Sequence, residues 1–228
     1  MHMLTSSEKK FSIIYGVIVI AEFISGALED FTSFNYVFKP AIVLSLLIFF
    51  WIKSEKLDKK LKLIIVSALV FSLIGDILLM CVDESPNYFL FGLVAFLLAH
   101  VMYAVAFLRH RNKTANPFGF VIFLMLYAAG LFYLSKDGLN ELLIPVIIYM
   151  LVILAMVTAA FLRRGNVPKL SYTFVLLGAL FFMISDSILA VNKFYTPLDY
   201  SSISIMTTYA SAQYLIIFGI LRLVIASR

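Results

Sequence analysis

The segment that decides the fold is FFMISDSILA, residues 181–190, in which one aspartate, Asp186, lies within an apolar run. An earlier segment, FSLIGDILLM at residues 71–80, repeats the pattern around Asp76. In both segments a Phe stands five residues before the Asp, a Gly or Ser directly precedes it, and Ile and Leu follow. Because an ionisable side chain is costly inside a bilayer, each aspartate predicts a functional site.

The composition indicates that these aspartates lie in a membrane protein. Of the 228 residues, 63% are hydrophobic and 14% are charged, and the mean hydropathy is +1.02. A soluble domain is roughly 45–50% apolar and about 25% charged. The net charge of +5 resides in short loops between apolar segments, which is typical of membrane topology and not of a nucleic-acid surface. The single cysteine, Cys81, rules out an intramolecular disulfide.

Eight segments are long and apolar enough to cross a bilayer, for which a helix needs about 20 residues. They lie at residues 11–28, 37–53, 62–82, 88–108, 117–135, 140–162, 171–191 and 203–225. Because the connecting loops are short, we predict an all-α membrane protein whose single domain, residues 1–228, is a compact bundle of eight transmembrane helices. The repeated block falls in the third and seventh helices, which run in the same direction and suggest two parallel four-helix halves.

The basic residues predict the orientation of the bundle. Of the 18 Lys and Arg residues, 15 (Arg228 among them) fall at the two termini or in alternate loops, and only Lys39, Lys136 and Lys193 fall on the other side. The positive-inside rule then places both termini in the cytoplasm and requires an even number of spans. We expect a multi-pass integral protein in contact with membrane lipids, and favour a bacterial cytoplasmic membrane over the endoplasmic reticulum.

This orientation gathers polar side chains near the outer face. Glu22, Asp76 and Asp186 lie about five or six residues before the outer ends of their helices, roughly 8–9 Å of rise, so we expect one shared depth. Lys39 and Pro40 are expected to open the second helix on the same side. The other candidates are His100, Tyr103, Ser185, Tyr209 and Gln213. A structural interpretation is open for each: a helix–helix hydrogen bond, a core histidine or, for Lys39, an interfacial anchor.

Several chemistries lack the residues that they need. His100 is the only histidine within a predicted span, so a zinc hydrolase with several histidine ligands is not expected. The sequence has no G-x-S-x-G elbow, P-loop or G-x-G-x-x-G segment, and we expect neither a metal nor a cofactor. Two neighbouring carboxyl groups at low dielectric do not easily ionise together, so one can act as a general acid beside a carboxylate. Such a pair suits the cleavage of acid-labile ethers.

The assembled motifs resemble the YhhN-like membrane proteins, a family that includes the lysoplasmalogenases. The resemblance rests on Lys39-Pro40, on G-D-x-x-L at residues 75–79, on F-x-x-G-x-x-x-F-x-x-x-H-x-x-Y at 89–103, on G-A-x-x-F-x-x-S-D-x-x-L-A at 178–190 and on Y-x-x-x-Q-x-L-I at 209–216. The motifs span the chain from the second predicted helix to the eighth.

The resemblance implies hydrolysis of the vinyl ether bond of lysoplasmalogens, a class of lysophospholipid. The products would be a fatty aldehyde and glycerophosphoethanolamine or glycerophosphocholine. It also implies that Asp76 and Asp186 are catalytic and that the other motif residues shape the site. From the residues alone, the alternative is a proton-coupled transporter or a lipid-binding membrane protein that uses the same aspartate pair. No nucleic-acid partner is expected.

Overall fold

A computed structural model describes residues 5–27, 32–85 and 87–225, and within these ranges the chain forms helices and no strands. The long helices are α1 (Ser6–Ala27), α2 (Thr32–Lys53), α3 (Lys59–Met80), α4 (Asn87–Leu108), α5 (Phe118–Ser135), α6 (Leu143–Phe161), α7 (Lys169–Phe194) and α8 (Ser201–Ile225). Two short 3-10 turns, η2 (Lys136–Gly138) and η3 (Asn140–Leu142), connect α5 to α6. The predicted all-α class is confirmed.

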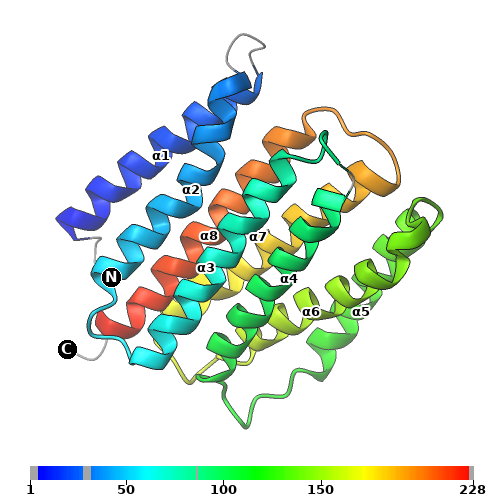
Figure 1. Cartoon of the computed structure of the whole chain (residues 1–228). Coiled ribbons are helices and arrows are strands. Elements are labelled where there is room, and N and C mark those ends of the chain that lie inside the picture. Colours follow the sequence, from blue (N-terminus) through cyan, green and yellow to red (C-terminus); the bar gives the residue numbers. More distant parts are fainter. Residues whose placement is uncertain (1–4, 28–31, 86, 226–228) are drawn as a thin grey trace.

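The helices α3, α4, α7 and α8 form the centre of the bundle, with α1 and α2 on one flank and α5 and α6 on the other (Figure 1). Glycines bring the two central pairs into close contact. A Cβ on Gly75 of α3 would lie 2.6 Å from the Phe96 ring of α4, and one on Gly178 of α7 would lie 2.9 Å from the Ala212 carbonyl of α8. The repeated sequence block lies in the first helix of each of these two pairs, α3 and α7. The two parallel four-helix halves remain a prediction.

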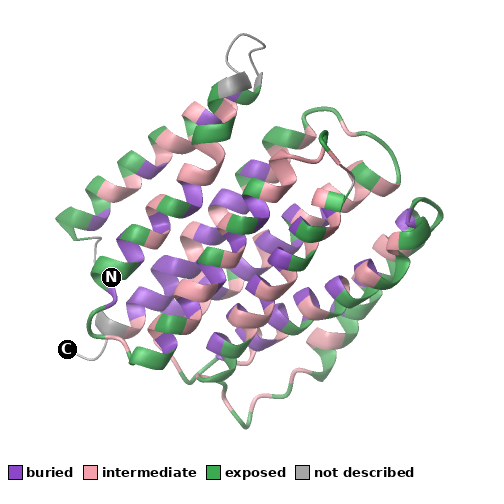
Figure 2. Ribbon diagram, in the orientation of Figure 1, coloured by how far each residue is buried: buried purple, intermediate pink, exposed green. Residues whose placement is uncertain are grey.

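Seven of these helices are long and apolar enough to cross a membrane within the described ranges. In α1 the described residues include Glu8, Lys9, Lys10 and Glu22, which lower its apolar character below that of the other seven. Figure 2 shows buried residues concentrated along the central helices and exposed residues along the flanks. The exposed side chains on α5 and α6 include Leu126 (69%) and Ile144 (68%), which suit a lipid environment. The chain is a multi-pass integral membrane protein.

Two helices, α1 and α2, begin five residues earlier than the sequence predicted. The helix α1 starts at Ser6, where Thr5 and Glu8 form reciprocal hydrogen bonds of 2.7 and 3.3 Å that cap its first turn. The helix α2 starts at Thr32, so the prediction that Lys39 and Pro40 open it is wrong. Pro40 lies inside α2. A membrane helix tolerates a proline because the ring removes only one backbone N–H donor, and neighbouring groups can satisfy the carbonyl that this leaves free. Hydropathy found the apolar part of each helix and missed its polar end.

Polar contacts close the end of the bundle that carries the termini. Glu8 and Arg222 form a buried ion pair of 3.1 Å between α1 and α8. The fully buried Arg163 donates to the Ser171 hydroxyl at 2.9 Å, and this hydroxyl donates to the Gly219 carbonyl at 2.6 Å. Burial lowers the pKa of Arg163 to about 10, which still leaves it charged at neutral pH.

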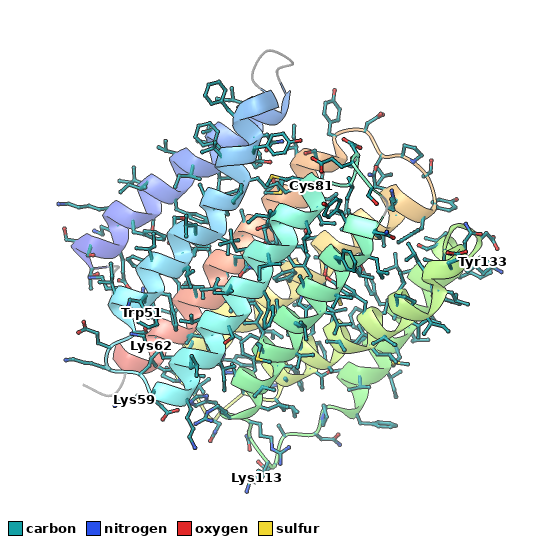
Figure 3. The ribbon with its side chains drawn as sticks, viewed as in Figure 1. Trp51, Lys59, Lys62, Cys81, Lys113 and Tyr133 are labelled. Carbon is teal, nitrogen blue, oxygen red and sulfur yellow. The ribbon has the colours of Figure 1, made fainter. Side chains whose placement is uncertain are left out.

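The lysines that predict the cytoplasmic side gather at this same end. Lys59, Lys62 and Lys113 project from it, whereas Cys81 lies at the opposite end (Figure 3). Lys62 also lies over the Trp51 ring, with its Nζ 4.2 Å from the ring centroid, as expected for an interfacial aromatic. Arg228, one of the residues in the orientation argument, lies outside the described residues.

Candidate functional site

Asp76 and Asp186 line one cavity of about 270 Å³. The cavity lies among α2, α3, α4, α7 and α8, towards the end opposite the termini. Its polar lining consists of Lys39, Asp76, Ser185, Asp186, Asn192, Lys193, Ser201, Ser202 and Tyr209. The two acids that the repeated block supplies are thus brought to a common space, although 110 residues separate them in the chain. Their parallel helices and equal position within the block explain this shared depth.

Asp76 is held by a network of side chains from its own helix α3 and from two others, α4 and α8. The Tyr209 hydroxyl of α8 donates to its Oδ2 at 2.9 Å, and Asp76 itself is only 2% exposed. Behind Tyr209, Gln213 donates to the Ser72 hydroxyl at 3.0 Å and to the Tyr209 hydroxyl at 3.4 Å, and it accepts from Tyr103 at 2.6 Å. Tyr103 and Gln213 do not line the cavity, so they orient Tyr209, which in turn orients Asp76.

Asp186 has a different set of partners. The Tyr149 hydroxyl of α6 donates to its Oδ2 at 2.5 Å, and the Nε2 of His100 lies 3.7 Å from the same oxygen. His100 is fully buried and packs edge-on against Tyr149 and Phe182, with ring centroids 5.3 and 4.5 Å apart. The Asp186 side chain is 18% exposed, so it reaches the cavity while His100 stays behind it.

Phe182 separates the two hydrogen-bond networks. Its ring contacts His100 on one side and Tyr209 on the other, at centroid distances of 4.5 and 5.3 Å. Each carboxyl group therefore has its own tyrosine donor, and the two tyrosines come from α6 and α8. Within the described ranges, no group of three His, Cys, Asp or Glu side chains is arranged to hold a metal ion. The arrangement offers two separately positioned carboxyl groups facing one space, which is the requirement for paired acid–base chemistry.

Three predicted residues occupy other positions around this centre. Glu22 is buried and lines a neighbouring cavity that shares only Ser202 with the aspartate cavity. Lys39 lines the aspartate cavity and interacts electrostatically with both Glu22 and Asp76. Ser185 lines it too, and its hydroxyl donates to the Ile205 carbonyl at 3.0 Å, which joins α7 to α8. The structure thus brings Lys39 and Ser185 to the aspartate pair and places Glu22 one cavity away.

Asp186 also borders a second, apolar pocket. This pocket lies among α4, α5, α6 and α7 and shares Leu79, Phe89, Phe96, Asp186 and Leu189 with the aspartate cavity. Apart from Asp186, its lining is almost entirely aliphatic and aromatic. Asp186 therefore stands at the boundary between a polar space and an apolar one, whereas Asp76 faces only the polar space.

Sequence reasoning missed Tyr149 and Lys193. Tyr149 is a polar residue in the middle of the apolar segment that forms α6, and this was the one signal that could have identified it. Lys193 counted only as one of three basic residues on the outer side, yet it lines the aspartate cavity, and its Nζ lies 5.3 Å from the Phe89 ring centroid. Neither residue lies in a motif on which the resemblance rests.

The fold and the cavity define a class of protein: a multi-pass helical membrane protein with a pair of buried aspartates beside an apolar pocket. The chain belongs to the YhhN family, whose model matches residues 34–220. This range contains both aspartates, both tyrosine donors and every residue that lines the aspartate cavity. The resemblance found in the sequence motifs is confirmed.

Curated relatives carry the name lysoplasmalogenase. The chain is 33% identical to human lysoplasmalogenase TMEM86B over 156 residues, which are 68% of this chain and 62% of the human protein. It is 34% identical to a lysoplasmalogenase of Mycobacterium bovis over 163 residues, 68% of this chain and 59% of the relative. The chain thus covers about three-fifths of the length of these relatives. No solved structure matches it.

Proposed function

We propose that this protein hydrolyses the vinyl ether bond of lysoplasmalogens, with Asp76 and Asp186 as the catalytic groups. The observation that carries the proposal is that both aspartates line one cavity, in which Asp186 also borders an apolar pocket. The names of the curated relatives support the same substrate class. A lysoplasmalogen joins a hydrocarbon chain to a polar headgroup at its vinyl ether, so the reacting bond belongs where the polar and apolar spaces meet.

The position of each acid suggests its role. Asp186, on the apolar side, would deliver a proton to the vinyl carbon β to the ether oxygen. This protonation leaves an oxocarbenium ion at the carbon bonded to oxygen. Asp76, in the polar cavity beside Lys39, would act as the carboxylate that takes a proton from water as the water adds to this cation. The resulting hemiacetal collapses when its hydroxyl proton moves to the ether oxygen, and it releases a fatty aldehyde and a glycerophospho-alcohol.

The polar cavity suits the headgroup of such a substrate. Lys39 and Lys193 line it together with Asn192, Ser201 and Ser202. Two ammonium groups match the negative charge of a phosphodiester, and the hydroxyl groups can donate hydrogen bonds to its oxygens. Because the same site can hold ethanolamine or choline beyond the phosphate, both glycerophosphoethanolamine and glycerophosphocholine are proposed products.

The test is aldehyde release by purified protein in detergent, supplied with lysoplasmenyl-ethanolamine. We expect Asp76→Asn and Asp186→Asn each to lower kcat about a hundredfold to ten-thousandfold, the usual contribution of a positioned acid or base. Asp58→Asn is the matched control, because Asp58 caps α3 at the other end of the bundle and asparagine caps a helix equally well. Loss of its exposed ion pair with Arg109 costs at most about 1 kcal/mol.

Two outcomes would reject the proposal. Wild-type protein that binds the lipid without releasing aldehyde would favour the transporter or lipid-binding alternative. Aldehyde release that survives both aspartate substitutions unchanged would leave the vinyl ether chemistry standing but remove its aspartate mechanism.

A further inference from the structure

The apolar pocket beside Asp186 continues towards the lipid-facing surface of the bundle. A groove of about 500 Å³ between α5 and α7 shares Tyr127, Leu131 and Ser187 with the pocket. The rest of the groove is lined by Leu126, Gly130, Leu134, Ile184, Ile188, Val191 and Leu198. Polar cavity, apolar pocket and surface groove therefore lie in a row, and each shares lining residues with the next.

The helix α5 is the least enclosed wall of this series. Only 17% of its span is buried within the protein, against 56% for α8. Gly130 of α5 opens directly onto the groove, and a Cβ placed there would have no atom within 4 Å. The side chains between the apolar pocket and the groove, which line both, are Tyr127 and Leu131 of this peripheral helix and Ser187 of α7.

We propose that the α5–α7 groove is a lateral portal through which the hydrocarbon chain of a single-chain ether phospholipid passes from the bilayer into the apolar pocket. The proposal rests on the proposed function for the identity of the lipid. The chain would lie in the apolar pocket among α4, α5, α6 and α7, the headgroup would remain in the polar cavity, and the ether would lie beside Asp186. A fatty aldehyde would leave by the same route, since it is as apolar as the chain that entered.

Another membrane-facing groove provides a comparison within the same protein. It lies between α1 and α8, also has a volume of about 500 Å³, and is lined by Gly16, Tyr15, Tyr214 and neighbouring residues. A Cβ on Gly16 would likewise have no atom within 4 Å. This groove shares no lining residue with either the aspartate cavity or the apolar pocket. It meets the Glu22 cavity at Phe23, and that cavity meets the aspartate cavity only at Ser202, so a lipid chain seated in the groove would lie two spaces away from Asp186 and outside the apolar pocket.

The first experiment uses a saturated 1-O-alkyl lysophosphatidylethanolamine that carries a diazirine within its chain. A saturated ether has no double bond to protonate, so the probe reports binding whether or not the protein hydrolyses vinyl ethers. After irradiation of the protein in detergent, we expect labelled peptides from residues 126–134 of α5, 146–154 of α6 and 183–191 of α7, which line the groove and the apolar pocket. Labelling confined to residues 12–23 and 207–215, or spread evenly over the lipid-facing helices, would overturn the proposal.

The second experiment compares Gly130→Trp with Gly16→Trp. The indole at position 130 fills the portal; if it displaces two methylenes of the bound chain, probe affinity falls by more than about tenfold. The same substitution at position 16 fills the α1–α8 groove, which does not border the apolar pocket, and should leave affinity within about twofold, the size expected of a scattered surface change. Equal effects of both substitutions would overturn the portal.

The two proposals fail in different ways. Aldehyde release without labelling of α5 and α6 would remove the portal and leave the hydrolase. Labelling of α5 and α6 by the saturated probe without any aldehyde release from the vinyl ether would remove the hydrolase and leave the portal. If Gly130→Trp does not yield folded protein, the labelling map of the wild-type chain still decides the portal.

Discussion

Each of the two aspartates accepts a hydrogen bond from a tyrosine of another helix, and this pairing is the residue-scale feature that the mechanism depends on. Tyr209 of α8 reaches Asp76, and Tyr149 of α6 reaches Asp186. A phenol is a short-range donor that can fix a carboxyl group without adding charge to a low-dielectric site. The tyrosines are therefore positioning residues, which set where each acid points.

Removing either phenol should slow turnover without preventing binding. A hydrogen bond to a carboxylate contributes about 1.5–3 kcal/mol. In the proposed mechanism Asp76 is a carboxylate before the reaction and Asp186 becomes one as it releases its proton. Tyr149→Phe and Tyr209→Phe should therefore each lower kcat about ten- to a hundredfold and leave KM within about twofold. Steady-state aldehyde release in detergent gives both constants. Tyr133→Phe is the control, because the Tyr133 side chain is 70% exposed and should have full activity. A rise in KM alone would mean that the tyrosines hold substrate and not the aspartates.

The two aspartates could be predicted from sequence and Tyr149 could not, for a physical reason. Inserting an ionisable side chain into a bilayer costs free energy, so Asp76 and Asp186 can be recognised as functional candidates without any knowledge of their neighbours. A tyrosine in the same setting is ordinary, because its ring is apolar and its hydroxyl needs only one partner. Whether that partner is a catalytic acid depends on the packing of α6 against α7, which a single sequence does not encode locally.

At the scale of helices, the number and order of the elements followed from hydropathy, but their ends did not. A spanning helix is recognised by its apolar length, whereas its backbone hydrogen bonds continue into polar residues at the interface. The capped turn at Thr5 and the helical residues before Pro40 are examples. The predicted span from residue 140 agrees with the apolar segment Asn140–Phe161, in which the 3-10 turn η3 precedes α6. Pro145 falls in the first turn of α6, where no backbone donor is required.

The contact between α7 and α8 sets the position of Asp186 relative to Tyr209, and it depends on Gly178. A Cβ there would lie 2.9 Å from both the Ala212 carbonyl and the Ile216 amide, which are backbone atoms and cannot rotate away. Gly178→Ala should therefore destabilise the protein by about 1–3 kcal/mol, the usual cost of overpacking, and lower the thermal unfolding midpoint in detergent.

Gly130→Ala is the matched substitution on α5, where an added methyl group meets no atom within 4 Å. It should leave the unfolding midpoint unchanged or slightly higher, because alanine favours a helix over glycine by about 1 kcal/mol. Equal changes of stability in the two variants would mean that the close α7–α8 contact at Gly178 does not control the response.

At the scale of the whole molecule, the buried contacts of Arg163 and Arg222 and the aspartate cavity lie at opposite ends of the bundle. The contacts of Glu8 with Arg222 and of Arg163 with Ser171 close the end that carries the termini, and the aspartate cavity lies towards the other end. If the positive-inside rule holds for this chain, the cavity faces the outer half of the bilayer. The headgroup of a substrate would then be taken from the outer leaflet, and its water-soluble product would be released on the outer side.

The two ends of α5 allow this orientation to be measured with matched substitutions. Lys113 lies in the exposed segment before α5, and Lys136 directly follows its last residue. In a Cys81→Ser background, which removes the native thiol, Lys113→Cys and Lys136→Cys should be labelled differently by a membrane-impermeant maleimide applied to intact cells. We expect labelling of the cysteine at 136 alone, and labelling of both after the membrane is permeabilised. The reverse pattern would place the cavity at the cytoplasmic leaflet, because the contacts between α1 and α8 fix the termini and the cavity at opposite ends whichever way the bundle is inserted.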